Sequence, residues 1–185
     1  MKQFNAAVLA LLSTEEFPAL LVTVRASGMR THAGQISLPG GGRDSTETPA
    51  QTALRETWEE VGIAPEDIEI DGEMPEITAP QTGKKIIPVV GRLASPYSAS
   101  NPYPLKLSES EVASAHWLKL ADLAHPDHRG TWKHSTRVGP GFELDGLMIW
   151  GLTGYIVDRL LIREGYVQPW DVTRNLVIPP RFGSR

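Results

Sequence analysis

The chain contains no cysteine among its 185 residues. This absence excludes disulfide bonds, thiol nucleophiles, iron–sulfur clusters and cysteine-ligated zinc. Any metal that the protein uses must bind to carboxylates, histidines or backbone oxygens. The composition thus favours an oxygen-ligated metal before any motif is considered.

The sequence also lacks a long apolar run. The run near the start, Ala6 to Leu12, is too short to span a bilayer, and no small-residue cleavage pattern follows it. We therefore expect a buried strand at this position, and a cytoplasmic protein that does not bind membranes.

Positive charge is not in excess. The chain has 18 Lys and Arg against 22 Asp and Glu, a net charge of −4. This balance provides no field that would hold a polyanion non-specifically, so we expect no nucleic-acid partner. The length predicts a single domain over residues 1–178, followed by a frayed tail at 179–185.

Short apolar and β-branched runs alternate irregularly with two amphipathic segments, which predicts an α/β fold with a mixed sheet covered on both faces. The predicted strands are 6–12, 19–25, 36–38, 68–74, 85–93, 112–118, 141–144 and 147–150. Turn residues predict hairpins between the first two strands and, at Asp145-Gly146, between the last two. The predicted helices are 49–61 and 152–163.

The first predicted helix has clear start and stop signals. Thr48 and Gln51 form a capping box, and Pro49 suits the first helical position. Gly62 favours a left-handed stop after Val61.

Three glutamates of this helix, Glu56, Glu59 and Glu60, fall on one face because successive residues turn by about 100°. Carboxylates at this spacing repel one another. They form either a solvated face with Arg55 as a partial counter-ion, or a site for a hard divalent cation. The residues expected to pack against the sheet from the opposite face are Ala50, Ala53, Leu54, Thr57, Trp58 and Val61.

The context of the helix favours the cation site. The chain reads Gly41-x5-Glu47-x7-Arg55-Glu56-Thr57-Trp58-Glu59-Glu60-Val61-Gly62-Ile63. This resembles the Nudix box, G-x5-E-x7-R-E-U-x-E-E-x-G-U, in which U is a bulky apolar residue, and Thr57 is the single departure. The resemblance implies a Nudix α/β/α sandwich with a central mixed sheet and a loop–helix–loop catalytic motif. It also implies hydrolysis of a diphosphate linked to another moiety, with Mg²⁺ or Mn²⁺ as cofactor.

Carried over position by position, the resemblance implies a metal site on this helix. Glu56 and Glu60 would be the principal ligands, and the Gly40 carbonyl would be a further ligand. Glu59 would be a ligand or a group that positions water. Such metals neutralise the diphosphate and lower the pKa of a bound water.

The remaining fixed positions of the box would hold the motif together. The resemblance implies an ion pair between Glu47 and Arg55 that ties the loop to the helix, with Arg55 beside the catalytic glutamates. Gly41 and Gly62 would be structural.

A second motif precedes the box. It reads Leu21-Val22-Thr23-Val24-Arg25-Ala26-x3-Arg30-x3-Gly34-x3-Leu38-Pro39-Gly40-Gly41. This is similar to the signature of the coenzyme A pyrophosphatase subgroup, L-L-T-x-R-[SA]-x3-R-x3-G-x3-F-P-G-G. Two residues differ from it, Val22 and Leu38.

The loop in this second motif carries the candidate substrate-binding residues. Arg25 and Arg30 bracket it, and guanidinium groups bind phosphate bidentately. Coenzyme A carries a diphosphate and a separate ribose phosphate, so two fixed cations suit it. His32 and Gln35 are further candidates. The alternative is that the arginines are solvated or form structural ion pairs, and that the histidine is a hydrogen-bonded structural group.

Nudix enzymes often use one more acid from outside the box, as general base or extra ligand. Glu109 and Glu111 precede the strand predicted at 112–118, and alternation would place both on one side of an early-starting strand. We favour Glu111, with Glu73 and Glu76 as weaker candidates. The alternative is a solvated strand entry.

Together the two motifs imply an enzyme that hydrolyses coenzyme A or its derivatives to 3′,5′-ADP and (acyl-)4′-phosphopantetheine. One alternative is a Nudix diphosphatase that acts on ADP-ribose or dinucleoside polyphosphates. Another is a Nudix module that senses a nucleotide without cleaving it. The expected partner is a small diphosphate substrate, and a homodimer is left open.

Overall fold

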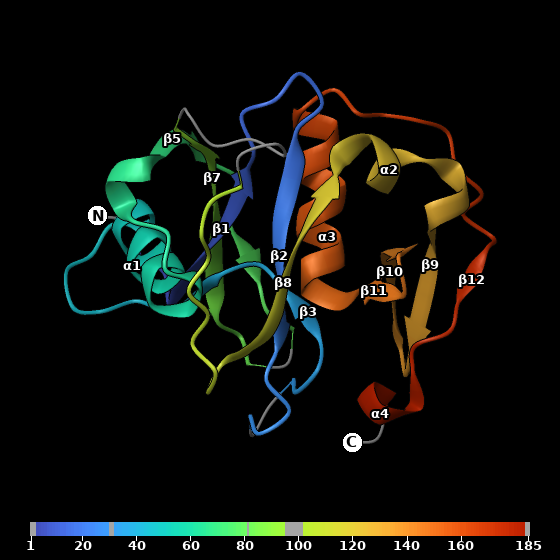
Figure 1. Ribbon diagram of the computed structural model, residues 1–185. Coiled ribbons are helices and arrows are strands. Elements are labelled where there is room, and N and C mark those ends of the chain that lie inside the picture. The colour runs from blue at the N-terminus through green and yellow to red at the C-terminus, as the bar shows by residue number, and fades with distance from the viewer. Residues whose placement is uncertain (1–2, 30–31, 81, 95–101, 184–185) are drawn as a thin grey trace.

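The computed structural model describes residues 3–29, 32–80, 82–94 and 102–183 (Figure 1). Its centre is an eight-stranded sheet whose main path runs β3-β2-β1-β7-β5, with β4 paired to β1, β6 to β7 and β8 to β2. The strands are β1 (Ala6–Leu12), β2 (Ala19–Arg25), β3 (Ile36–Ser37), β4 (Gly40–Gly42), β5 (Ile68–Glu73), β6 (Ile77–Thr78), β7 (Lys85–Leu93) and β8 (Val112–Lys119). Because β1 and β7 are parallel and the other pairs are antiparallel, the sheet is mixed, as predicted.

The two faces of this sheet are covered by different helices. In β1, Leu9 and Leu11 belong to the core that includes residues of α1 (Pro49–Val61). Ala10 and Leu12 belong to the core that includes residues of α3 (Gly151–Arg163). Successive strand residues point to opposite faces, so β1 contributes to both cores. The predicted α/β/α sandwich is therefore confirmed (Figure 1).

Strand β4 was expected to be loop. Its three glycines give no apolar pattern, but Gly40, Gly41 and Gly42 pair antiparallel with Val8, Ala7 and Ala6. The predicted hairpin of β1 and β2 is consequently short, with Leu12 opposite Leu20 as its register pair. The start of β1 thus pairs with β4 at the entrance to α1.

A second sheet of four strands, which we did not predict as a unit, lies beyond α3 from the first (Figure 1). Its strands are β9 (Arg129–His134), β10 (Arg137–Leu144), β11 (Leu147–Ile149) and β12 (Asn175–Leu176), in the order β11-β10-β9-β12. The hairpin at Asp145-Gly146 is confirmed, because Leu144 pairs with Leu147 and both turn residues have positive φ.

Short helical segments complete the chain: η1 (Pro65–Asp67), α2 (Leu120–Ala124), η2 (Pro126–His128) and α4 (Pro180–Gly183). Helix α4 forms within the tail expected to fray, and Phe182 packs beside Trp150 with ring centroids 6.5 Å apart. None of the helices in the described ranges has the length and apolar character needed to cross a membrane.

Candidate active site

Helix α1 begins and ends where the sequence predicts. The Thr48 side chain accepts a hydrogen bond from the Gln51 N–H, the Gln51 side chain accepts one from the Thr48 N–H, and Gly62 ends the helix at φ 74°. This fixed helix lies against β4 and β1. Its glutamates therefore face backbone that the sheet holds in place.

A glycine at position 41 leaves room for the Glu56 carboxylate between β4 and α1. A Cβ atom on Gly41 would lie 2.4 Å from Oε2 of Glu56, closer than any real side chain allows. Its neighbour Gly42 has open space at the same position. The Glu56 carboxylate is thus packed on the Gly41 backbone.

Arg55 lies at the centre of a polar network that connects the loop before α1 with the helix. Its Nε lies 2.9 Å from Oε1 of Glu47, and its Nη2 donates to the Gly42 carbonyl at 2.8 Å. Its Nη1 lies 2.9 Å from Oε1 of Glu56 and 3.2 Å from Oε2 of Glu59. The hydrogen bond from Arg55, assisted by one from Thr52, lowers the pKa of Glu47 to about 2, and the same contact raises the pKa of Arg55.

Glu60 is the buried member of the acidic cluster, with 6% of its surface exposed. Its Oε2 accepts a hydrogen bond from the Gly40 N–H at 3.3 Å. Burial raises the pKa of Glu60 to about 8, and the charges of Glu56 and Glu111 act in the same direction, whereas Arg25 opposes them. Burial also raises the pKa of Glu56. Both shifts favour the protonated form of these carboxyl groups when no cation is bound.

The exposure of α1 corrects one expectation. Trp58, predicted to pack on the sheet, is 52% exposed, while Glu60, predicted to lie with Glu56 and Glu59 on the face opposite the packing residues, is buried. Ala53, Thr57 and Val61 fill the contact with the sheet. The apolar pattern of α1 did not predict correctly which side chains face the sheet. The hydrogen bond between the Gly40 N–H and Glu60 depends on tertiary structure, so the pattern could not reveal it.

Arg25 ends β2 at the base of the loop that carries the candidate substrate residues. The loop is closed by hydrogen bonds from the Arg25 N–H to the Gln35 carbonyl at 3.0 Å and from the Gly34 N–H to the Arg25 carbonyl at 2.9 Å. Nε of Arg25 is buried and has no hydrogen-bond partner within the part of the chain that the structure describes. Nδ1 of exposed His32 lies 3.1 Å from Oε1 of Gln35. Arg30 lies outside the described residues.

Glu109 and Glu111 lie in a turn and do not alternate along an early strand. The Glu111 N–H donates to the Ser108 carbonyl at 2.9 Å, and β8 starts only at Val112. The Glu111 carbonyl accepts from the Ala26 N–H at 2.8 Å, which places Glu111 beside Arg25. Burial is the main cause of the raised pKa values of Glu56 and Glu60, and the charge of Glu111 adds a smaller contribution in the same direction.

The donor set suits a hard cation such as Mg²⁺ or Mn²⁺, since it consists of carboxylates and a backbone carbonyl. Within the described ranges, no three His, Asp or Glu side chains already converge on one metal position. Arg55 contacts both Glu56 and Glu59. The residues that could hold a cation are Glu56, Glu59, Glu60 and the carbonyl of Gly40.

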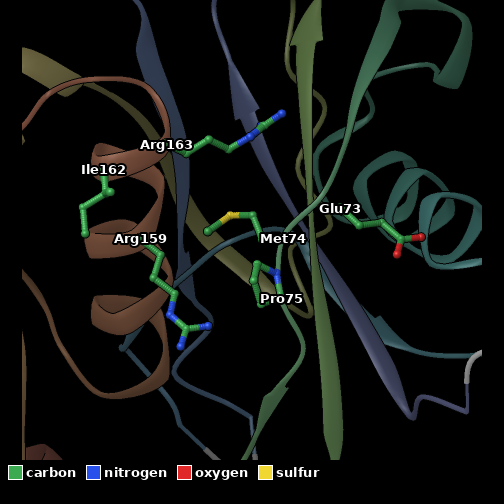
Figure 2. Close-up of a pocket in the computed structure, with 6 residues that line it drawn as sticks. All are labelled: Glu73, Met74, Pro75, Arg159, Ile162 and Arg163. Carbon is green, nitrogen blue, oxygen red and sulfur yellow. The ribbon is translucent and has the colours of Figure 1, made fainter.

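Surface hollows lie beside α3 and beside the end of α1 in the described part of the chain. One of about 360 Å³ lies against α3, on the face of the sheet away from α1, and Glu73 at its edge points away from α3 (Figure 2). It is lined by Glu73, Met74, Pro75, Arg159, Ile162 and Arg163. The other, of about 280 Å³, borders the acidic cluster through Glu59. It is lined by Trp58, Glu59, Gly62, Lys106, Leu107 and Ser108.

Lys106 and Ser108 line this hollow, although neither belongs to the two sequence motifs. No motif marks them, and hydrogen bonds to the end of α1 bring them beside Glu59. Only the folded arrangement of residues 103–108 along the helix could have identified them.

Comparison with known proteins gives consistent results. Residues 1–137 match the family model described as the NUDIX domain. The chain is 36% identical over 173 residues to an uncharacterized Nudix hydrolase NudL of Enterobacter sp. (strain 638), covering 87% of this chain and 83% of the relative. It is 35% identical over 173 residues to an uncharacterized Nudix hydrolase NudL of Cronobacter sakazakii, covering 89% and 85%.

Solved structures show the same fold. A Nudix hydrolase from M. smegmatis, RenU, aligns with a TM-score of 0.61 at 20% identity, covering 91% of this chain and 89% of that one. A MutT/nudix family protein from Enterococcus faecalis aligns with a TM-score of 0.54 at 17% identity, covering 88% and 63%.

Proposed function

Because the chain belongs to the NUDIX domain family, we propose that it is a metal-dependent diphosphatase that cleaves coenzyme A or its derivatives. The products would be 3′,5′-ADP and (acyl-)4′-phosphopantetheine. The observation that supports this substrate class is Arg25. Its Nε is buried beside the acidic cluster without a partner in the described ranges, in the motif that resembles the coenzyme A pyrophosphatase signature.

The acidic cluster would hold Mg²⁺ or Mn²⁺ through Glu56, Glu59, Glu60 and the Gly40 carbonyl. When bound, the cation neutralises diphosphate charge and makes water more acidic. Glu60 must lose its proton to act as a ligand. Because burial disfavours the unpaired carboxylate, a bound cation would stabilise the ionised form of Glu60. Arg55 is held by Glu47 and by the Gly42 carbonyl. Through its contacts with Glu56 and Glu59, it would keep these two carboxylates oriented.

Arg25 would bind the diphosphate. Its backbone is fixed by two hydrogen bonds of the closed loop, and Nε has an N–H to offer. A guanidinium in this position can donate to phosphate oxygens in a forked geometry. Arg30, His32 and Gln35 would complete the contacts from the same loop.

Glu111 would act as general base. A water oxygen attacks one phosphorus, the bond from that phosphorus to the bridging oxygen breaks, and the water proton passes to the Glu111 carboxylate. The bridging oxygen leaves with the other phosphate. Attack at either phosphorus gives the same two products, 3′,5′-ADP and (acyl-)4′-phosphopantetheine.

A substrate panel tests the proposal. Purified protein with Mg²⁺ or Mn²⁺ is incubated with coenzyme A, acetyl-coenzyme A, coenzyme A disulfide, ADP-ribose and diadenosine tetraphosphate, and products are separated by chromatography. We expect 3′,5′-ADP from the coenzyme A compounds at the highest kcat/KM. Efficient cleavage of ADP-ribose or diadenosine tetraphosphate with coenzyme A left intact would contradict the substrate assignment.

A further inference from the structure

Trp58 is exposed beside the candidate metal ligands. Half of its surface is open to solvent, and it precedes Glu59 directly on α1. It lines the hollow of about 280 Å³ together with Lys106 and Ser108. A large exposed indole at the border of a candidate active site has the character of a binding surface, because tryptophan combines apolar area with a polar edge.

The opposite wall of this hollow is fixed to the helix. The Lys106 N–H donates to the Val61 carbonyl at 2.9 Å, and the Ser108 N–H donates to the Glu60 carbonyl at 2.9 Å. A Cβ on Gly62 would lie 2.8 Å from Cβ of Lys106, so the absence of a side chain there allows the close approach. The backbone of Lys106 and Ser108 is thus held against the end of α1 by hydrogen bonds. We expect this wall of the hollow to keep its position when a ligand binds.

The same segment is anchored again at Tyr103. Its hydroxyl donates to Oδ2 of Asp67 at 2.8 Å and accepts from the Ala64 N–H at 3.2 Å. Leu105 and Leu107 pack against the core on the α1 side of the sheet. Residues 103–108 are therefore attached to α1 and to the segment that follows it at several points.

The chemistry of the hollow is that of a nucleotide site. The Trp58 ring can stack on a nucleotide base. Such stacking does not depend strongly on which base is present, because every base has a π-face. Lys106 forms no ion pair with any residue in the described ranges, so its ammonium is available to a phosphate. The Ser108 hydroxyl lies 3.2 Å from that of Ser110, and when Ser110 is the donor of this bond the O–H of Ser108 is left to donate to a phosphate oxygen. The one acid in the lining, Glu59, is already paired with Arg55 at 3.2 Å.

We infer that Trp58, Lys106 and Ser108 form the subsite for the 3′-phosphoadenosine end of the substrate, an inference that rests on the proposed function. Glu59 belongs both to this hollow and to the acidic cluster. When the diphosphate lies at the acidic cluster, the nucleoside attached to it would lie in the adjacent hollow. Trp58 would stack on the adenine, and Lys106 and Ser108 would bind the 3′-phosphate.

Binding of the product 3′,5′-ADP tests this without hydrolysis. Its Kd is measured by calorimetry on the full chain, alongside 5′-AMP, which lacks the 3′-phosphate. We expect Trp58→Leu to weaken both ligands by about 5- to 100-fold, and Trp58→Phe to restore most of the affinity because a ring remains. Lys106→Met should weaken 3′,5′-ADP by about 10-fold and leave 5′-AMP within 2-fold, because it removes one charge-assisted contact.

Phe17→Leu is the matched control, since Phe17 is an aromatic side chain that is 59% exposed and lies at the β1–β2 turn. Equal affinities in wild type, Trp58→Leu and Lys106→Met would overturn the subsite. In turnover, Trp58→Leu should raise KM for coenzyme A more than it lowers kcat.

The outcomes separate the subsite from the proposed function. If coenzyme A is not cleaved but the affinity for 3′,5′-ADP depends on Trp58 and Lys106, the substrate assignment fails and the nucleotide subsite stands. If coenzyme A is cleaved and 3′,5′-ADP binds with equal affinity to all variants, the function stands and the subsite is wrong.

Discussion

The carboxylate of Glu60 accepts a hydrogen bond from the backbone N–H of Gly40 at 3.3 Å, across 20 residues of sequence. One hydrogen bond does not compensate for the burial of this side chain, whose pKa rises to about 8. In the metal-free protein Glu60 therefore binds a proton that the unfolded chain, with an ordinary glutamate pKa of about 4.5, has already lost at neutral pH.

The pH dependence of stability follows from this difference. Between pH of about 4.5 and 8, the folded metal-free protein retains the Glu60 proton and the unfolded chain does not, so stability falls by up to about 1.4 kcal/mol per pH unit and then levels off. Glu60→Gln carries no charge and should not show this loss. Urea unfolding with EDTA at pH 5, 7 and 9 measures it. If the difference in the free energy of unfolding between wild type and Glu60→Gln did not increase with pH, the raised pKa of Glu60 would be contradicted.

Glu60→Gln should also abolish turnover and the stabilisation by Mg²⁺. A neutral amide is a much weaker ligand for a hard cation than a carboxylate, so metal no longer raises Tm. Thermal melts with and without Mg²⁺ are compared with product formation from coenzyme A. Wild-type rates in the variant would refute the role of Glu60 as a metal ligand.

Gly41→Ala should lower activity far more than Gly42→Ala. The added methyl group at position 41 would lie 2.4 Å from Oε2 of Glu56, whereas position 42 has open space. Because Glu56 must move, we expect a loss of about 100-fold or more in kcat/KM, as misplacement of catalytic groups commonly produces. Steady-state kinetics of both variants test this. Comparable activity in the two variants would show that the Glu56 position is not critical.

Glu47→Gln should destabilise the protein in a pH-dependent manner. Arg55 lowers the pKa of Glu47 to about 2, so the stabilisation from this pair is complete above pH of about 4.5 and is lost as the pH falls toward 2. We expect a loss of about 1–3 kcal/mol at pH 7, typical of a hydrogen bond to a charged group, that shrinks as the pH falls to 3. Denaturant unfolding at the two pH values measures it, with exposed Glu16→Gln as the control.

Glu111→Gln should lower kcat by about 100-fold or more, the scale of general-base catalysis, while Glu109→Gln stays within a few-fold of wild type. Both residues lie in the same turn, but it is Glu111 whose charge acts on Glu56 and Glu60. Metal stabilisation measured by Tm should persist in both variants. The reverse order of activities would assign the base to Glu109.

Local features were predictable from the sequence because they depend on neighbouring residues. The capping box of Thr48 and Gln51, the left-handed stop at Gly62 and the turn at Asp145-Gly146 all occur as expected. Each rests on hydrogen bonds or backbone angles within a few residues. The apolar runs of β1, β2 and β7 were likewise located to the residue.

Features that depend on distant contacts were not predictable. Strand β4 exists because three glycines pair with β1, and β9 has no alternation that would reveal it. The inward turn of Glu60 and the exposure of Trp58 depend on how α1 is rotated against the sheet.

The sequence by itself determined which residues are candidates for the chemistry: a set of carboxylates on a capped helix, in a chain without cysteine. Tertiary structure decided how those residues differ from one another. Glu60 is buried, Glu59 lies at the border of a hollow, Glu47 is ion-paired, and Glu111 rather than Glu109 lies beside Arg25. The physical reason is that motif spacing follows from local geometry, whereas burial, charge environment and pKa depend on segments that only the folded chain brings together.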